Sequence, residues 1–121
     1  MKKENILHTK SYQFAIRIVN LSLYLNKEKK EYVLSKQVLR SGTSIGALVS
    51  ESKYAQSKAD FLNKLMISLK EANETQYWIN LLYDTHFITP QMHQSLFNDI
   101  DEIISLLSSI TKTIKNQSIT A

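Results

Sequence analysis

The residues that end helices and shape turns are nearly absent from this sequence. Two glycines and one proline occur in 121 residues, and there is no cysteine. A sheet protein of this length needs many turns, which are commonly built from glycine and proline, whereas long helices need few. The length is also that of one domain. We therefore predict a single all-α domain over residues 1–121.

Residues 9–25 carry two rows of apolar side chains at helical spacing, following Thr9 as a candidate N-cap. The first row recurs every three or four residues: Phe14, Ile18, Leu21 and Leu25. The second row runs beside it: Tyr12, Ile16, Val19 and Leu23. A helix that is apolar on two flanks is usually buried by more than one partner, so it either lies deep in a bundle or contributes to an oligomer interface. The charged segment 26–31 is predicted to be a loop.

A second helical pattern begins at Leu34 or Ser35 and has a thin apolar face. That face should hold Val38, Ser41, Ile45, Leu48 and Ser52. Gly42 and Gly46 lie four residues apart here, and each costs a helix about 1 kcal/mol relative to alanine. We expect close approach of another helix to offset this cost. The alternatives are a local break at residues 41–43 and a phosphate-binding loop, which lacks the Lys-Ser/Thr ending and the preceding strand of a P-loop.

The second half of the chain predicts two further helices after a polar break at residues 55–57. Ser57 and Asp60 have capping-box spacing, so the third helix should start at Ser57 and run to about His86. Thr89 before Pro90 marks the start of the fourth helix, because proline is tolerated at the first helical position. Its apolar row keeps strict spacing: Leu96, Ile100, Ile103, Leu107, Ile110 and Ile114. We predict an antiparallel up-down-up-down four-helix bundle, with flexible ends at residues 1–8 and 116–121.

The sequence offers no constellation for catalysis or metal binding. Di-iron four-helix bundles use Glu-x-x-His motifs, which this chain lacks. The three histidines sit without ligand spacing: His8, His86 and His93. Glu71 and Glu74 could serve acid–base chemistry, but such residues more often pair with a basic residue on an adjacent helix, such as Arg40. We predict no enzymatic activity, no cofactor and no metal.

The sequence also lacks membrane and export signals. No uninterrupted apolar run approaches the ~20 residues of a membrane-spanning helix, and the first ten residues contain lysines but no apolar signal segment. The absence of cysteine fits a reducing compartment. We expect a cytoplasmic protein without membrane association.

Positive charge is concentrated in the first half of the chain. The net charge is +4 overall, with +6 in residues 1–60 and −2 in residues 61–121. If the first two helices are neighbours, basic residues on one side of each could form one surface for RNA or DNA. The candidate nucleic-acid-binding residues are Lys10, Arg17, Lys27, Lys29, Lys30, Lys36 and Arg40. The alternative is that Arg17 and Arg40 pair with acids such as Glu71 and Glu74, leaving only scattered exposed lysines.

Two segments of the sequence resemble a known family. They are LRSGTSIGALVSE at residues 39–51 and DFLNKLMISLKEANETQYWINLL at residues 60–82. Both resemble signature segments of bacterial four-helix-bundle proteins encoded in intervening sequences of 23S ribosomal RNA genes, and the resemblance covers essentially the whole chain. Many members resemble a second helix with Arg-Arg after the leucine and Glu-Gly at its close, whereas here Ser41 follows Arg40 and Ser52 follows Glu51. Because the second arginine of that pattern is absent here, this difference concerns how much of the family's basic surface this chain retains.

What the resemblance implies is a ring-like homopentamer. The fold is similar to the accessory variability protein of diversity-generating retroelements, a basic pentamer that binds nucleic acid beside a reverse transcriptase. By resemblance, the expected partners are copies of this chain, RNA or DNA, and a protein such as a reverse transcriptase. Two functions stay open: a non-enzymatic, oligomeric, nucleic-acid-associated binding protein of the rRNA intervening-sequence type, or a homo-oligomeric protein–protein scaffold that binds no nucleic acid.

Overall fold

The protein is built from four long helices, as the apolar spacing predicts. The structure, a computed structural model, describes the backbone of residues 2–120 and the side chains of residues 3–117. The helices are α1 (Lys2–Lys29), α2 (Leu34–Ser52), α3 (Lys58–Asp84) and α4 (Pro90–Thr120), and residues 2–120 form no strand. Met1 and Ala121 lie outside the described residues, so the flexibility expected of these two positions stays a prediction.

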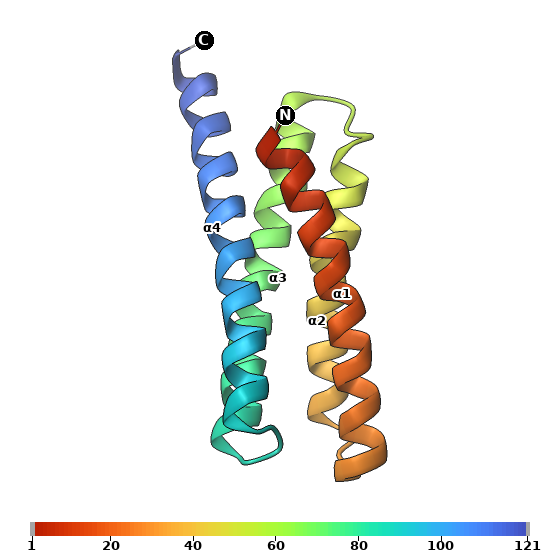
Figure 1. Cartoon of the computed structure of the whole chain (residues 1–121). Helices are drawn as coiled ribbons and strands as arrows, with labels where there is room; N and C mark the ends of the chain where they lie inside the picture. The colour runs from red at the N-terminus through yellow and green to blue at the C-terminus, as the bar shows by residue number, and fades with distance from the viewer. Residues whose placement is uncertain (1, 121) are drawn as a thin grey trace.

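The helices run alternately up and down at the corners of a square. α1 and α3 each pack against both α2 and α4, whereas the diagonal pairs make no close backbone contact in the described part of the chain. The α1–α2 and α3–α4 connections lie at one end, and the α2–α3 connection lies at the other end with the start of α1 and the end of α4 (Figure 1). The α1–α4 and α2–α3 edges are therefore on opposite sides. None of the described helices is long and apolar enough to span a membrane.

The core is formed by the apolar rows that the sequence spacing identified. The first row of α1 and the row of α4 are buried at every position: Phe14, Ile18, Leu21, Leu25, Leu96, Ile100, Ile103, Leu107, Ile110 and Ile114. In α2, Val38 and Ile45 are buried as expected, but Val49 rather than Leu48 completes the face. The buried rows of α1 and α4 thus follow directly from helical periodicity.

The two glycines of α2 allow it to lie close to α1. A Cβ atom at Gly42 would be 2.8 Å from Ile18 Cγ1, and one at Gly46 would be 3.1 Å from the backbone carbonyl oxygen of Ser11. A side chain at position 42 would require the Ile18 side chain to shift, and one at position 46 would be in unusually tight contact with the α1 backbone. The predicted close approach is confirmed, and α2 is continuous through residues 41–43, so the local break is absent.

Buried hydroxyl groups fill the neighbouring face of α2, where it meets α3. Ser68 Oγ donates a hydrogen bond to the carbonyl oxygen of Ile45 at 3.0 Å, and Thr75 Oγ1 lies 2.9 Å from Ser41 Oγ. A buried hydroxyl is tolerated when it is hydrogen-bonded in this way. α2 has few large apolar residues, and it packs instead through glycines against α1 and through hydrogen-bonded hydroxyl groups against α3.

Several helix ends differ from the sequence prediction. α1 begins at Lys2 rather than near Thr9, because Leu7 lies buried on the core face two turns before Phe14 and extends the helix. α1 also continues to Lys29 through part of the expected loop. The positive charges of Lys27 and Lys29 in its last turn stabilise the negative, C-terminal end of the helix dipole. α4 is helical to Thr120, although the chain was expected to be irregular from residue 116.

The connections at the bundle ends are held by hydrogen bonds. The predicted cap at Ser57 is confirmed, since Ser57 Oγ accepts from the Asp60 N–H at 3.0 Å, and the Asp60 carboxylate reaches back to the Gln56 N–H at 3.2 Å rather than to that of Ser57. At the start of α4, Thr89 Oγ1 accepts from the Met92 N–H at 3.1 Å, a cap that was not predicted from the sequence. The α2 N-terminus uses a group that the sequence did not indicate. The carboxylate of Glu31 accepts hydrogen bonds from the N–H groups of residues 33, 34 and 35, at 3.1, 2.9 and 2.8 Å. It therefore neutralises the positive end of the α2 dipole.

Candidate functional site

Two of the candidate nucleic-acid-binding residues on α1 are paired with acids on α4. Arg17 Nη1 lies 2.6 Å from Asp99 Oδ2, and Arg17 Nη2 donates to Ser95 Oγ at 2.9 Å. Lys10 Nζ lies 3.2 Å from Glu102 Oε1. These side chains hold the α1–α4 edge together, and their positive charge is largely offset where it stands.

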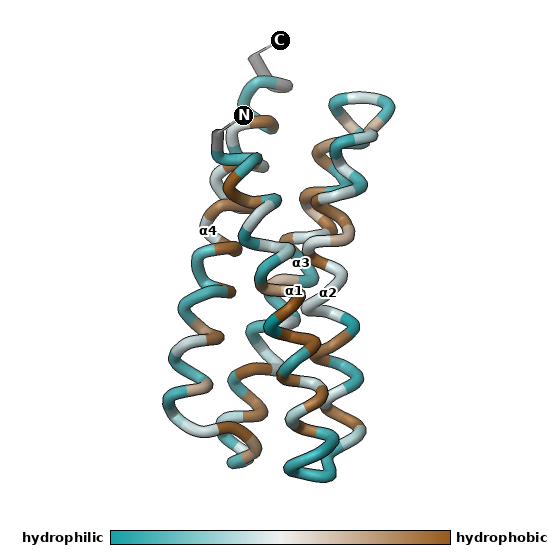
Figure 2. Tube along the Cα trace, turned by 45° about the vertical axis from the view of Figure 1, so that its right-hand side comes forward, coloured by the Kyte–Doolittle hydropathy of each residue, from teal (hydrophilic) through white to brown (hydrophobic). Residues whose placement is uncertain are grey.

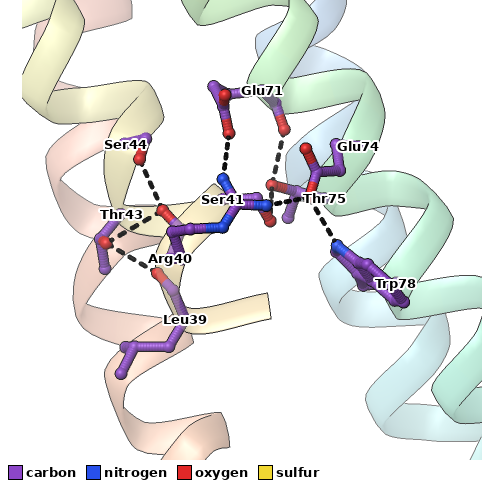
Figure 3. Close-up of polar contacts among 9 residues, drawn as sticks. All are labelled: Leu39, Arg40, Ser41, Thr43, Ser44, Glu71, Glu74, Thr75 and Trp78. Carbon is purple, nitrogen blue, oxygen red and sulfur yellow. Dashed lines mark hydrogen bonds and ion pairs between the residues drawn. The ribbon is translucent and has the colours of Figure 1, made fainter. Parts of the chain in front are cut away.

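Arg40 is paired on the other side of the bundle, between α2 and α3. Figure 3 shows its guanidinium group between the carboxylates of Glu71 and Glu74. The Arg40 Nη1 to Glu71 Oε1 distance is 3.2 Å, and Trp78 Nε1 donates to Glu74 Oε2 at 2.9 Å. Both carboxylates of the candidate acid–base pair are therefore engaged by Arg40, which confirms the predicted pairing with a basic residue on an adjacent helix.

The expectation that Lys10, Arg17, Lys36 and Arg40 share one surface is wrong. Lys10 and Arg17 face α4, whereas Arg40 faces α3, and these two edges lie on opposite sides of the bundle. The first two helices are neighbours, as assumed, but these paired basic side chains point away from the α1–α2 edge rather than across it. The pairing of Arg17 and Arg40 with acids, which the alternative interpretation predicted, is confirmed, with Asp99 as the partner of Arg17.

Removing Arg40 should destabilise the bundle. In Arg40→Ala, Glu71 and Glu74 would lie near each other without a cation, so we expect the free energy of unfolding to fall by about 1 kcal/mol at low salt. Chemical denaturation measures this, and the decrease should be smaller at high salt because the repulsion is screened. Lys53→Ala is the control, since Lys53 is exposed and makes no ion pair among the described residues. Equal midpoints for the two variants would contradict the expectation.

The remaining four candidate residues form a separate group, which we call the lysine end. It consists of Lys27, Lys29, Lys30 and Lys36. All four are exposed at the end of the bundle where α1 turns into α2, and none makes an ion pair with a described residue. Hydrophilic positions gather there in Figure 2. Of the two acids in this segment, Glu31 is occupied in capping α2, whereas Glu28 is exposed between Lys27 and Lys29, so the four lysines outnumber the one acid that is not capping a helix.

The second apolar row of α1 is not covered by the bundle. Tyr12, Ile16, Val19 and Leu23, which we call the apolar stripe, are 66, 50, 43 and 52% exposed. They lie along three turns of one helix face, on the side of α1 away from the core. Hydrophobic positions recur along the length of α1 in Figure 2. A continuous apolar row of this kind is typical of a surface that contacts another protein.

No cluster of three or more potential metal ligands occurs among the side chains that the structure describes. His93 Nε2 lies 2.8 Å from Asn80 Oδ1, and its ring stacks on Tyr83, so this histidine has a packing role. His86 serves the backbone, because it occupies the left-handed region with φ 68° just after α3. Both histidines near the α3–α4 connection thus have structural roles.

Comparisons with known proteins agree with the resemblance seen in the sequence. The family described as "23S rRNA-intervening sequence protein" matches residues 3–109. A crystal structure of a protein with unknown function, from the S23 ribosomal protein family from Bacteroides thetaiotaomicron, is similar with a TM-score of 0.89 and 57% sequence identity, over 91% of this chain and 98% of that one. No curated protein matches. This chain belongs to the 23S rRNA-intervening sequence protein family.

Proposed function

We propose that this protein is a non-enzymatic binding protein that self-associates through the apolar stripe and binds RNA through the lysine end. The main support for RNA binding is an observation about four lysines: Lys27, Lys29, Lys30 and Lys36. They lie together at one end of the bundle, and none makes an ion pair with a described residue. Exposed, unpaired lysines bind phosphates by releasing condensed counterions, with little dependence on sequence. The family name refers to 23S rRNA, which makes structured RNA the first polyanion to test.

Self-association would strengthen this binding. One lysine end offers few phosphate contacts, and its affinity for a polyanion is expected to be weak. In a cyclic assembly the lysine ends would be repeated around the axis, so that one RNA could touch several of them and bind with avidity. We propose a pentameric ring on the strength of the family resemblance. Such a ring uses a heterologous interface, in which the apolar stripe of one subunit meets a different patch of the next.

The competing proposal is a homo-oligomeric scaffold without nucleic-acid binding. The observation that favours it is the pairing of Lys10, Arg17 and Arg40 with acidic side chains. These three of the seven candidate residues are already neutralised within the bundle. Under this proposal the apolar stripe is the functional surface, and the lysine end serves solubility alone.

Salt-dependent binding distinguishes the two proposals. We expect the wild-type protein to retain RNA, and its affinity to fall steeply between about 50 and 200 mM salt. Replacing Lys27, Lys29, Lys30 and Lys36 by alanine should reduce the slope of log affinity against log salt by about one for each phosphate that is no longer neutralised. Fluorescence anisotropy with labelled RNA and duplex DNA measures both quantities.

The matched control removes the same charge elsewhere. Lys53, Lys58, Lys70 and Lys112 are exposed and make no ion pair with a described residue. Their joint replacement by alanine gives the same net charge, so a slope that depends on the lysine end should stay close to that of the wild type. If the folded, oligomeric wild-type protein retains neither nucleic acid at about 50 mM salt, the scaffold proposal replaces RNA binding.

A further inference from the structure

A pocket opens beside the lysine end, between the last turns of α1 and the connection from α3 to α4. Its lining includes Tyr24 and Lys29 from α1 and Tyr83, Asp84, His86 and Phe87 from the other side. Ile88, which is buried, also lines it. Three aromatic rings and a lysine thus meet at one opening, in a region whose other exposed charges are mainly lysines.

The aromatic side chains that line the pocket are fixed by contacts with the rest of the protein. The ring of Tyr83 stacks on His93 with centroids 4.3 Å apart and planes inclined by 20°, and His93 is in turn fixed by its hydrogen bond to Asn80. Tyr24 and Phe87 are partly buried and pack against the hydrophobic core. All three rings are therefore restrained by packing against the protein, which lowers the entropic cost of ordering them around a ligand.

The backbone around the pocket is equally well defined. The Phe87 N–H donates to the carbonyl oxygen of Leu82 at 2.9 Å, and the His86 N–H donates to that of Tyr83 at 3.0 Å. With His86 in the left-handed region, these two bonds form a Schellman motif that ends α3. Thr89 then caps α4. The connection that carries Phe87 is thus a preformed wall of the pocket.

The polar groups at the opening limit which kinds of ligand the pocket can bind. Lys29 supplies a positive charge, and the hydroxyl groups of Tyr24 and Tyr83 make no hydrogen bond to any described residue, so they are free to donate or accept. Asp84 adds a carboxylate, which repels a simple anion but accepts hydrogen bonds from amino or hydroxyl groups. A ligand that suits all of these groups has a flat ring, hydrogen-bond donors and a phosphate.

We infer that this pocket takes one unpaired nucleotide of a nucleic acid bound at the lysine end, an inference that rests on the proposed RNA binding. The base lies against Tyr24, Tyr83 and Phe87, and its phosphate faces Lys29. Stacking on aromatic side chains is how proteins hold the exposed bases of single-stranded loops and ends, because every base offers a π-face. The other lysines then contact phosphates of the flanking chain. The lysine end therefore prefers RNA with unpaired nucleotides over a continuous duplex.

The test compares a single-stranded oligonucleotide with a fully paired duplex of the same length, each as RNA and as DNA. The variant Tyr24→Leu with Phe87→Leu removes two rings while keeping apolar side chains at both positions. We expect it to weaken single-strand binding about tenfold or more, in line with the cost of removing base stacking, and to leave duplex binding unchanged. Circular dichroism melting verifies that it is folded, and Tyr24→Leu alone serves if the double variant is not.

Two controls make the result specific. Tyr54→Leu changes a tyrosine at the opposite end of the bundle, where the side chain is 83% exposed, and should bind like the wild type. Tyr24→Phe keeps the ring and should retain most of the single-strand preference. If the wild type binds both the single strand and the duplex, but the double variant binds each of them with wild-type affinity, the nucleotide pocket is refuted while RNA binding stands. If the wild type binds neither, the proposed RNA binding fails, and the pocket assignment with it.

Discussion

Introducing two glutamates into the apolar stripe, Ile16→Glu with Leu23→Glu, should turn an oligomer into a folded monomer of 14.0 kDa. Ile16 and Leu23 are seven residues apart, so they occupy the same face of α1 two turns from each other. In an interface their replacements would bring carboxylates out of water without partners, which opposes association strongly. Light scattering at micromolar concentration measures the mass of both proteins.

The fold of the subunit should survive this change. Ile16 and Leu23 are about half exposed, so the glutamates can reach water in the isolated subunit. Glutamate is also a good helix former, and the free energy of unfolding of a monomer should change by less than about 1 kcal/mol. Circular dichroism should therefore show the helix content of the wild type. A smaller mass together with retained helicity would assign the interface to the stripe.

The control for this experiment adds the same charge without removing apolar surface. Gln94 and Asn98 are exposed polar residues on α4, and Gln94→Glu with Asn98→Glu introduces two carboxylates there. This variant should keep the mass of the wild type. A wild-type protein that scatters as a monomer of 14.0 kDa at micromolar concentration would remove both the proposed assembly and the interface assigned to the stripe.

The periodic parts of the fold could be predicted from the sequence alone. Helical spacing places every residue of the α4 row on one face, whatever that face later contacts, and the whole row is buried. The spacing also separates two rows on α1. It could not decide whether the bundle covers the second row, because that depends on where α2 and α4 lie around α1. The structure shows that the row is left exposed.

Helix ends were harder to predict because the deciding contacts are distant in sequence. Thr9 has the chemistry of an N-cap, yet the burial of Leu7 continues α1 past it. The sequence predicts a start of α2 at Leu34 or Ser35, and the helix begins at Leu34; the sequence does not indicate the capping group, since Glu31 lies three residues upstream and reaches forward through its side chain. A carboxylate just before an uncapped helix start is the signal that could have identified it.

The candidate site was only partly predictable for a geometric reason. The spacing of Lys10 and Arg17 shows that they share a side of α1, but the direction of that side around the bundle is fixed by packing. The aromatic pocket was missed altogether. Tyr24, Tyr83 and Phe87 come from two distant parts of the chain, and only the assembly of the bundle brings them together. A tyrosine near a helix end carries no signal of this by itself.

Replacing Gly46 by leucine should lower the free energy of unfolding by about 1–3 kcal/mol through overpacking. A Cβ at this position already meets the backbone carbonyl of Ser11 at 3.1 Å, and backbone cannot rotate aside as a flexible side chain can. α1 would have to move away, which separates buried residues such as Ile18 from α2. Leucine gains about 0.8 kcal/mol in helix propensity over glycine, which is too small to offset the weaker packing.

The matched substitution is Ala47→Leu, one residue along the same helix. Ala47 is exposed, so leucine there adds the same kind of side chain outside the close approach to α1. We expect its melting temperature to stay within a few degrees of the wild type, while that of Gly46→Leu falls by roughly 4 °C for each 1 kcal/mol of destabilisation in a chain of 121 residues. The difference between the two variants isolates the close approach of α2 to α1 from any general effect of a larger side chain. Equal melting temperatures would show that α1 and α2 can separate at Gly46 without cost.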